Sequence, residues 1–259
     1  MPGPQKLNVN FGHGSSVGRV RETNQDYHRV KPFMTPKGAL YFLAVADGMG
    51  GAAAGERASK IAIETVTNAI SRYVDFLNEG RPAVSLEKAL EKAFLAANRE
   101  IYREAASNPS RDGMGTTLTV LLLSGRDLVL GHVGDSRCYR IRRGRITQLS
   151  KDHSWVAEQV EKGNLTLDEA SAHQYRNLLV KALGTRSKVE PQVQSDTLED
   201  ADIFVLCSDG LHGLVTETEL LDELQRNANL QSAIDFFIGL AESRGGPDNI
   251  TAVVAQVQT

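Results

Sequence analysis

The chain has 259 residues, of which 41% are hydrophobic and 24% are charged, a composition that excludes disordered, collagen-like and coiled-coil proteins. A formal net charge of −3 excludes a general cationic surface for nucleic acid or an anionic membrane, although a phosphate site needs only local charge. The apolar runs, such as 118–123, are much shorter than the ~20 residues that span a bilayer, so no membrane segment is expected.

The start of the chain and its cysteines favour a protein of a reducing compartment. Residues 1–6 lack the apolar core of a secretory signal. Cys138 and Cys207 each lie in a strand-like run, which is typical of small core residues rather than of a disulfide or a metal pair. No Pro/Ser-rich linker divides the sequence and no repeat occurs. We therefore expect one domain over residues 1–259, a monomer in the cytoplasm.

Strands are predicted where runs of Val, Leu, Ile and Phe are bounded by Gly, Asp or Ser. In chain order, these runs are 40–45, 117–123, 128–133, 203–207 and 251–257. Residues 138–141 and 145–148 flank Arg-Arg-Gly at 142–144, which predicts a hairpin. Apolar residues at helical spacing predict helices around 62–77, 86–101 and 230–242. Thr166 and Thr216 each begin a capping box, and the polar, helical segment 152–177 is expected to form a flap.

The order of these elements predicts the fold class. Helices come in consecutive pairs between groups of strands, which differs from the regular strand–helix alternation of a parallel sheet. We therefore predict an α+β fold in which helices pack over an antiparallel sheet or sandwich.

Four aspartates each follow or precede an apolar strand, beside a glycine or a tight turn: Asp47, Asp135, Asp209 and Asp248. Burying an unpaired carboxylate costs several kcal/mol, and a cluster costs more because like charges repel. If the four converge, a cation must hold them, and oxygen ligands without neighbouring His or Cys favour Mg²⁺ or Mn²⁺. Aspartate is also common in turns and helix caps, so each position alone has a purely structural explanation.

Residues 48–53, Gly-Met-Gly-Gly-Ala-Ala, fit the glycine pattern of a dinucleotide-binding loop between a strand and a helix. Two features argue against that function. The carboxylate of Asp47, directly before the first glycine, would repel a pyrophosphate. A second helix also follows the first, where a dinucleotide fold requires a second strand.

Seven stretches of the chain resemble the metal-dependent protein phosphatases (the PPM, or type 2C, serine/threonine phosphatases) in their short bacterial form. They follow the order of that family and lie between about residues 12 and 257. The stretches are 18–26 (GRVRETNQD), 45–51 (VADGMGG), 113–117 (GMGTT), 131–137 (GHVGDSR), 176–177 with 182–184 (RN and ALG), 207–211 (CSDGL) and 246–249 (GPDN).

The resemblance implies a four-layer fold, with two antiparallel sheets packed as a sandwich, a helix pair on each outer face and metals at one edge. By the matching motifs, Asp47 bridges two core Mn²⁺ or Mg²⁺ ions. The Gly48 carbonyl then binds one ion, while Asp209 and Asp248 bind the other.

Three further residues receive roles from the same motifs. Asp26 resembles the acid that holds metal-bound water. Asp135, together with Asp209, resembles the ligands of a third, weaker metal in bacterial members. Arg21 matches the arginine that grips the substrate phosphate, for which its planar fork is suited.

The implied activity is that of a protein-serine/threonine phosphatase, which hydrolyses phosphoserine and phosphothreonine by direct attack of a metal-bridging hydroxide. Two metals lower the pKa of a shared water and neutralise charge in the transition state. The implied partners are phosphorylated proteins and a eukaryotic-like serine/threonine kinase whose action the enzyme reverses. Nucleic acid is not an expected partner, since the basic hairpin 140–145 has no aromatic platform beside it.

Three positions depart from the family pattern. Met49 stands where some members carry a histidine proposed to protonate the leaving oxygen, so the general acid stays open between bound water and a histidine. Gly213 replaces an acid that many members have, which implies a weaker third metal. Gln25 replaces a glutamate beside Asp26. The candidate histidines are His13, His153, His173 and His212.

Two other functions fit the resemblance. A catalytically inactive, PPM-like binding domain would be expected to lose a core aspartate or the phosphate arginine, and none is lost here. The related phosphatases that act on an anti-sigma-factor antagonist have the same metals but often carry extra sensory or membrane domains.

Overall fold

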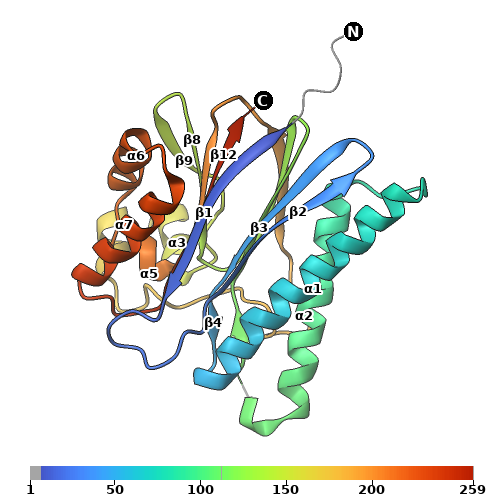
Figure 1. Ribbon diagram of the computed structural model, residues 1–259. Helices are drawn as coiled ribbons and strands as arrows, with labels where there is room; N and C mark the ends of the chain where they lie inside the picture. Colours follow the sequence, from blue (N-terminus) through green and yellow to red (C-terminus); the bar gives the residue numbers. More distant parts are fainter. Residues whose placement is uncertain (1–6, 112, 259) are drawn as a thin grey trace.

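Two five-stranded antiparallel sheets face each other at the centre of the protein (Figure 1). The computed structural model describes residues 7–111 and 113–258. Residues 1–6 and 259, the two ends of the predicted domain, therefore lie outside the described residues. The first sheet contains, in spatial order, β1 (Asn8–Ser16), β12 (Ile250–Gln258), β11 (Ile203–Cys207), β8 (Arg137–Arg142) and β9 (Arg145–Gln148). The second contains β10 (Gln192–Thr197), β7 (Asp127–Val133), β6 (Leu118–Ser124), β3 (Gly38–Ala46) and β2 (Tyr27–Thr35).

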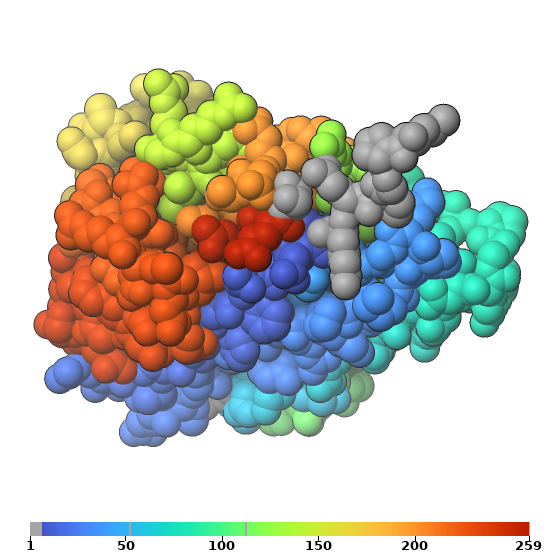
Figure 2. Space-filling model, turned by 45° about the horizontal axis from the view of Figure 1, so that its top comes forward, coloured from blue at the N-terminus to red at the C-terminus, as the bar shows by residue number. Residues whose placement is uncertain are grey.

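Helices cover the outer face of each sheet. The long pair α1 (Ala52–Asn78) and α2 (Leu86–Ser107) packs on the second sheet, and α6 (Glu217–Arg226) and α7 (Leu230–Ser243) pack on the first. Figure 2 shows the two helical layers at opposite flanks, with the strands between them. The predicted four-layer αββα sandwich is therefore confirmed, as are the capping boxes that begin at Thr166 and Thr216.

The remaining elements are short. A flap with the helices α3 (Trp155–Glu161) and α4 (Leu167–Ala172) occupies the segment where it was predicted, and a small ribbon joins β4 (Gly48–Met49) to β5 (Gly115–Thr116). One turn of 3₁₀ helix (Pro109–Arg111) follows α2, and α5 (Asp209–His212) follows β11. In the described part of the chain, no helix is both long and apolar enough to cross a bilayer.

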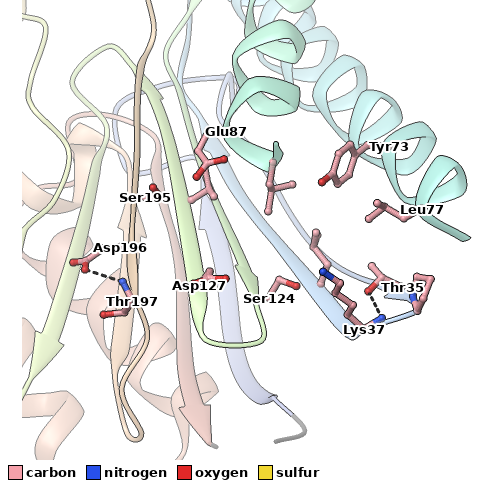
Figure 3. A pocket seen from close by; sticks show the side chains of 14 residues that line it. Thr35, Lys37, Tyr73, Leu77, Glu87, Ser124, Asp127, Ser195, Asp196 and Thr197 are labelled. Carbon is pink, nitrogen blue, oxygen red and sulfur yellow. Dashed lines mark hydrogen bonds between the residues drawn. The ribbon is translucent and has the colours of Figure 1, made fainter. Parts of the chain in front are cut away.

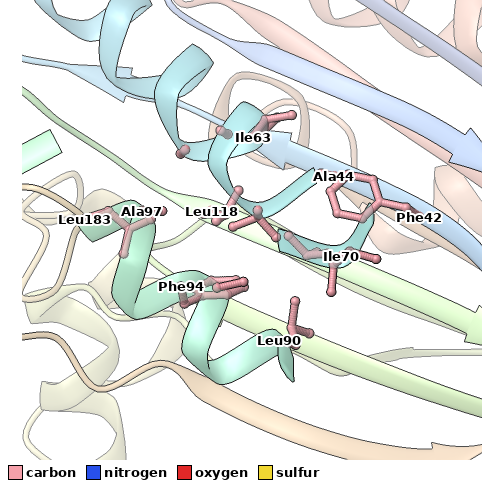
Figure 4. Close-up of a cluster of buried hydrophobic side chains, with 14 of the residues drawn as sticks. Phe42, Ala44, Ile63, Ile70, Leu90, Phe94, Ala97, Leu118 and Leu183 are labelled. Atoms are coloured by element: carbon pink, nitrogen blue, oxygen red, sulfur yellow. The ribbon is translucent and has the colours of Figure 1, made fainter. Parts of the chain in front are cut away.

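Alternation along β3 divides its side chains between two cores. Leu43 and Val45 face the opposite sheet, whereas Phe42 and Ala44 face the helices α1 and α2. Figure 4 shows this helix-covered core, where Phe94 of α2 packs among the side chains of the sheet. Each such side chain contributes ~1.5–3 kcal/mol by leaving water. A third core lies between the first sheet and α5–α7.

The topology also excludes the dinucleotide interpretation of residues 48–53. Both neighbours of β3 in its sheet, β2 and β6, run antiparallel to it. After α1, the chain continues into α2 rather than into a parallel strand. Cys138 and Cys207 are free, fully buried thiols, as predicted.

Candidate metal centre

Five aspartates gather at one end of the sandwich, the lower end in Figure 1 near β4 and α5. Three of them follow a strand: Asp47 comes directly after β3, and Asp135 and Asp209 lie two residues beyond the ends of β7 and β11, respectively. The other two, Asp26 and Asp248, precede β2 and β12. In an antiparallel sheet, the end of one strand lies beside the start of the next, so all five positions share this end. The structure thus brings the four aspartates singled out by their strands together with Asp26.

The backbone of Asp47 is fixed by hydrogen bonds to Thr116 and Thr117, at the end of β5. Its amide donates to Oγ1 of Thr117 at 2.9 Å, and its carbonyl accepts from the amide of Thr117 and from Oγ1 of Thr116, both at 2.8 Å. Thr117 in turn shares a hydrogen bond of 2.7 Å with the hydroxyl of Ser136, next to Asp135. One threonine therefore links the two loops that carry Asp47 and Asp135.

The glycine after Asp47 leaves room for a close approach of backbone to backbone. A Cβ at Gly48 would lie 2.1 Å from the carbonyl oxygen of Gly55 and 2.7 Å from that of Gln25. No side chain fits at these distances. The carbonyl of Gly48, which the resemblance implies as a metal ligand, is held in place by this packing.

Ser208 links Asp26 to the other sheet. Its hydroxyl donates to Oδ2 of Asp26 at 2.8 Å and accepts from the amide of Thr251 at 3.0 Å. Within residues 7–111 and 113–258, Oδ1 of Asp26 and Oδ1 of Asp209 are buried without a hydrogen-bond partner. Such orphaned acceptors are rare inside proteins, and each has a lone pair free for a cation.

Asn249 fixes the loop that carries Arg21 and Asp26. Its Oδ1 accepts from the amide of Gln25 at 2.8 Å. Its Nδ2 donates to the carbonyls of Val17 and Thr23 at 2.9 and 3.0 Å. One buried amide thus holds three points of a loop that lies 224 to 232 positions away in the sequence.

The pKa values reflect the crowding of carboxylates. Burial, followed by the repulsion of Asp209, raises the pKa of Asp26 to about 7 and that of Asp135 to about 8. Burial and the charges of the other four acids hold the pKa of Asp47 well above its usual range, and burial with Asp248 raises the pKa of Asp209. Asp135, with a pKa of about 8, therefore holds a proton at neutral pH that a divalent cation would displace.

Arg21 is the basic side chain that contacts this cluster. Its Nη2 donates to Oδ2 of Asp248 at 2.7 Å, and its side chain is 54% exposed. Among the described residues, no three His, Cys, Asp or Glu side chains already converge as the ligands of one ion. The end of the sandwich is therefore a cluster of buried and half-buried carboxylates with Arg21 at its rim.

The candidate histidines occupy different places. The ring of His212 contacts the carbonyl of Asp135 at 3.0 Å, and Nδ1 of His153 accepts from the amide of Gly134 at 3.1 Å. Burial lowers the pKa of both rings to about 4, so each is neutral at pH 7 and a poor proton donor. His173 packs in the flap against Trp155, and His13 contacts His28.

A large groove lies at the other end of the molecule. It has a volume of about 840 Å³ and opens between the hairpin turns of the second sheet and the facing ends of α1 and α2. Figure 3 shows its wall of Tyr73 and Leu77, with Lys37, Glu87 and Asp127 around it. The groove holds no residue of the carboxylate cluster.

Comparison with known proteins agrees with this site. The protein phosphatase 2C family matches residues 13–254. The serine/threonine protein phosphatase PstP of Mycobacterium tuberculosis is 38% identical over 251 residues, which cover 97% of this chain and 45% of PstP. The serine/threonine phosphatase stp of Listeria welshimeri is 36% identical over 239 residues, covering 92% of each chain. The chain thus spans about half the length of PstP and nearly all of stp.

A solved structure of the PstP catalytic domain, in complex with two manganese ions, superposes with a TM-score of 0.82 at 36% identity and covers 98% of this chain and 100% of that one. The fold and the carboxylate edge together resemble those of the metal-dependent protein phosphatases as a class. The match over residues 13–254 and the identity to stp make the assignment specific: the chain belongs to the protein phosphatase 2C family.

The sequence alone missed several residues that build this site. Ser208, Asn249 and Thr117 all lie inside the motifs quoted above, yet no chemical role was predicted for them. Their hydrogen-bond partners are 182, 224 and 70 positions away, respectively. For Ser208 and Asn249 the available signal was their place beside an aspartate at the end of a strand, whereas Thr117 has no aspartate beside it.

Proposed function

We propose that this chain hydrolyses phosphoserine and phosphothreonine in proteins, using two Mn²⁺ or Mg²⁺ ions at its carboxylate edge. The observation that carries the proposal is the convergence of five aspartates, four of them with raised pKa values. The names of the relatives PstP and stp, and the two manganese ions of the PstP structure, support the same activity.

The proposed ligands follow the family motifs. Asp47, whose carboxylate interacts with the charges of the other four aspartates, is assigned as the shared ligand that the resemblance implies, with the carbonyl of Gly48 on one ion. Asp209 and Asp248, from the first sheet, are assigned to the other ion, and Asp26 to its water shell. The unpartnered oxygens of Asp26 and Asp209 support this assignment, since a cation would satisfy both. Bound ions supply a water of lowered pKa and neutralise phosphate charge.

Arg21 is proposed to bind the phosphate. Its guanidinium lies at the rim of the cluster and is more than half exposed, so a phosphate can approach it from solvent. The hydrogen bond to Asp248 points it toward the carboxylates. A planar fork binds two phosphate oxygens at once, which positions the ester for in-line attack.

A third, weaker metal is proposed at Asp135 with Asp209. The repulsion between these two carboxylates contributes to the raised pKa of Asp135, which supports their closeness. Gly213 supplies no carboxylate to this position, so we expect the third ion to bind more weakly than the other two.

Phosphorylated proteins are the proposed substrates, and a serine/threonine kinase is the proposed opposing enzyme. An open edge accepts a protein loop more readily than a deep pocket would. The flap helices α3 and α4 are tied to the cluster, because Asp152 at the flap base binds Arg137 at 2.8 Å and His153 contacts Gly134. We propose that the flap shapes the choice of substrate, and that the chain acts as a single-domain monomer in the cytoplasm.

The inactive alternative has less support. The aspartates and Arg21 are all present, and the relatives carry phosphatase names. The basic hairpin also offers little to nucleic acid, because Arg140, Arg142 and Arg143 pair with carboxylates.

Phosphopeptide hydrolysis tests the proposed substrate class. One peptide carrying phosphoserine, phosphothreonine or phosphotyrosine in the same sequence would be offered with Mn²⁺, and phosphate release measured. Faster release from the first two supports the proposal. Equal or faster release from phosphotyrosine, or no release from any peptide by folded protein, would contradict it.

A further inference from the structure

Two imidazoles meet where the edges of the two sheets come together. Nδ1 of His13 on β1 lies 2.9 Å from Nε2 of His28 on β2. The ring centroids are 5.0 Å apart and the planes are inclined by 52°. Figure 1 shows β1 and β2 running beside each other, with the loop 17–26 joining them at the lower end. The hydrogen bond therefore connects the two sheets at the base of that loop.

Both histidines are held by rigid neighbours. The amide and carbonyl of His13 bond the side chain of Gln231 on α7, each at 3.2 Å. His28 lies opposite Val45 in the ladder between β2 and β3. Ligands that stand on regular strands keep their relative positions, which lowers the cost of ordering them around an ion.

The facing nitrogens suit a metal ion. In the present hydrogen bond, one nitrogen donates a proton and the other accepts it. A metal ion can replace the proton between the two rings. The ring that donated this proton is then protonated by solvent at its other nitrogen, so both rings stay neutral. Two nitrogens at ~2.0–2.1 Å from a tetrahedral ion lie about 3.3 Å apart. The facing nitrogens therefore need to separate by about 0.4 Å, and the two rings need to turn until both lone pairs point at the ion.

We propose that His13 and His28 form a binding site for a late transition-metal ion such as Cu²⁺, Ni²⁺ or Zn²⁺. Imidazole nitrogen favours these ions, whereas the carboxylate edge favours Mg²⁺ and Mn²⁺. Among the described residues, no third His, Cys, Asp or Glu completes the set. His13 is exposed, so water supplies the remaining ligands.

An ion at this site would close the base of the loop that carries Arg21 and Asp26. The loop is already fixed at its other side by Asn249. A metal ion bound by both histidines would link β1 to β2 and would thereby hold the loop to both sheets. The site therefore links a pair of imidazole ligands to the segment that carries Arg21, the proposed phosphate-binding residue.

Copper binding to the untagged protein tests the site without measuring activity. Cu²⁺ would be titrated in the presence of millimolar Mg²⁺, which occupies the carboxylates, and followed by electron paramagnetic resonance. We expect nitrogen hyperfine structure from two imidazoles in the parent protein. His13→Gln and His28→Gln should each weaken Cu²⁺ binding at least tenfold and remove one nitrogen from the spectrum. Because His13 is exposed, its variant is expected to fold even if the His28 variant does not.

The matched control is His173→Gln, which removes a histidine from the flap and should keep the two-nitrogen spectrum. A spectrum with oxygen ligands alone would overturn the proposal. Equal Cu²⁺ affinity in the parent protein and in folded His13→Gln would overturn it as well.

Discussion

The guanidinium of Arg21 donates a 2.7 Å hydrogen bond to the carboxylate of Asp248, which lies 227 positions further along the chain. With side chains that are 54% and 30% exposed, this pair contributes little to stability, because water screens it. Its effect is positional. Attraction to the negative charges of Asp248, Asp209 and Asp47 keeps the guanidinium of Arg21 beside the carboxylates, where a phosphate would be bound.

Replacing Arg21 should therefore reduce catalysis and leave the fold intact. Charged hydrogen bonds contribute ~1.5–3 kcal/mol each, so Arg21→Ala should lower kcat/KM for an aryl phosphate by about ten- to a hundredfold. Arg21→Lys should recover only part of the loss, since an ammonium cannot bind two oxygens in one plane. Steady-state kinetics would be compared with those of Arg19→Ala, an exposed neighbour in the same loop. Equal kinetics for the two alanine variants would remove Arg21 from phosphate binding.

Loss of the Asn249 amide should destabilise the protein. Asn249→Ala removes three hydrogen bonds and leaves the amide of Gln25 and the carbonyls of Val17 and Thr23 without this partner. Buried groups that lose their partners cost ~1–3 kcal/mol each, so we expect a loss of about 3 kcal/mol in the free energy of unfolding.

Urea denaturation would measure this loss, with Asn164→Ala as the control. Asn164 is exposed and bonds only a nearby glutamine among the described contacts, so its replacement should change stability by less than about 0.5 kcal/mol. If both variants unfold at the same urea concentration, Asn249 does not clamp the loop.

Two glycines give a paired test of the turn after Asp47. Gly48→Ala would place a Cβ 2.1 Å from the carbonyl oxygen of Gly55, so the β4 turn must shift and both stability and metal-dependent activity should fall sharply. Gly239→Ala, in the middle of α7, meets nothing within 4 Å. It should be neutral or raise stability by up to about 1 kcal/mol, because alanine favours a helix. Thermal unfolding would compare the two, and a well-tolerated Gly48→Ala would contradict the packing described here.

The buried ring of His132 should make stability depend on pH. Burial lowers its pKa to about 4, against ~6.5 in an unfolded chain, with His153 stacked 5.1 Å away and Asp152 nearby. Because the folded pKa is the lower one, the folded state resists protonation. Its contribution is fully present above pH 6.5 and is lost as the pH falls toward 4. Between pH 7 and 5 the loss is about 2 kcal/mol.

Denaturation of His132→Gln at both pH values would isolate this contribution, since the other titrating groups are common to the two proteins. The variant should lose about 2 kcal/mol less than the parent protein between pH 7 and 5. An identical loss in both proteins would show that His132 does not titrate in this range.

The central strands of the two five-stranded sheets could be predicted from sequence, whereas three of their four edge strands could not. β11 begins and ends where its apolar run predicts, and α7 extends one residue beyond the predicted helix. β1, β2 and β10 were missed, and all three lie at the edge of a sheet. Polar side chains are tolerated there because one flank faces solvent, so these strands carry no continuous apolar run.

The same distinction holds for the site. Four aspartates could be singled out because each lies at one end of a recognisable strand: Asp47, Asp135, Asp209 and Asp248. Asp26 and Arg21 instead lie beside the missed strands β1 and β2 and were found only through resemblance. The clamp of Asn249 and the link through Ser208 join segments from both ends of the chain. Local sequence carries no information about such contacts, which exist only once the two sheets have packed.

The aspartates at the end of the sandwich are proposed to bind the metals on which phosphate hydrolysis depends. The most direct measurement is hydrolysis of an aryl phosphate by metal-stripped protein, with Mn²⁺ or Mg²⁺ added back, for the parent chain, Asp209→Asn and the exposed control Asp222→Asn. We predict no activity without metal, recovery in the parent and in Asp222→Asn, and a loss of at least a hundredfold in Asp209→Asn. Activity without metal that survives Asp209→Asn would contradict the account.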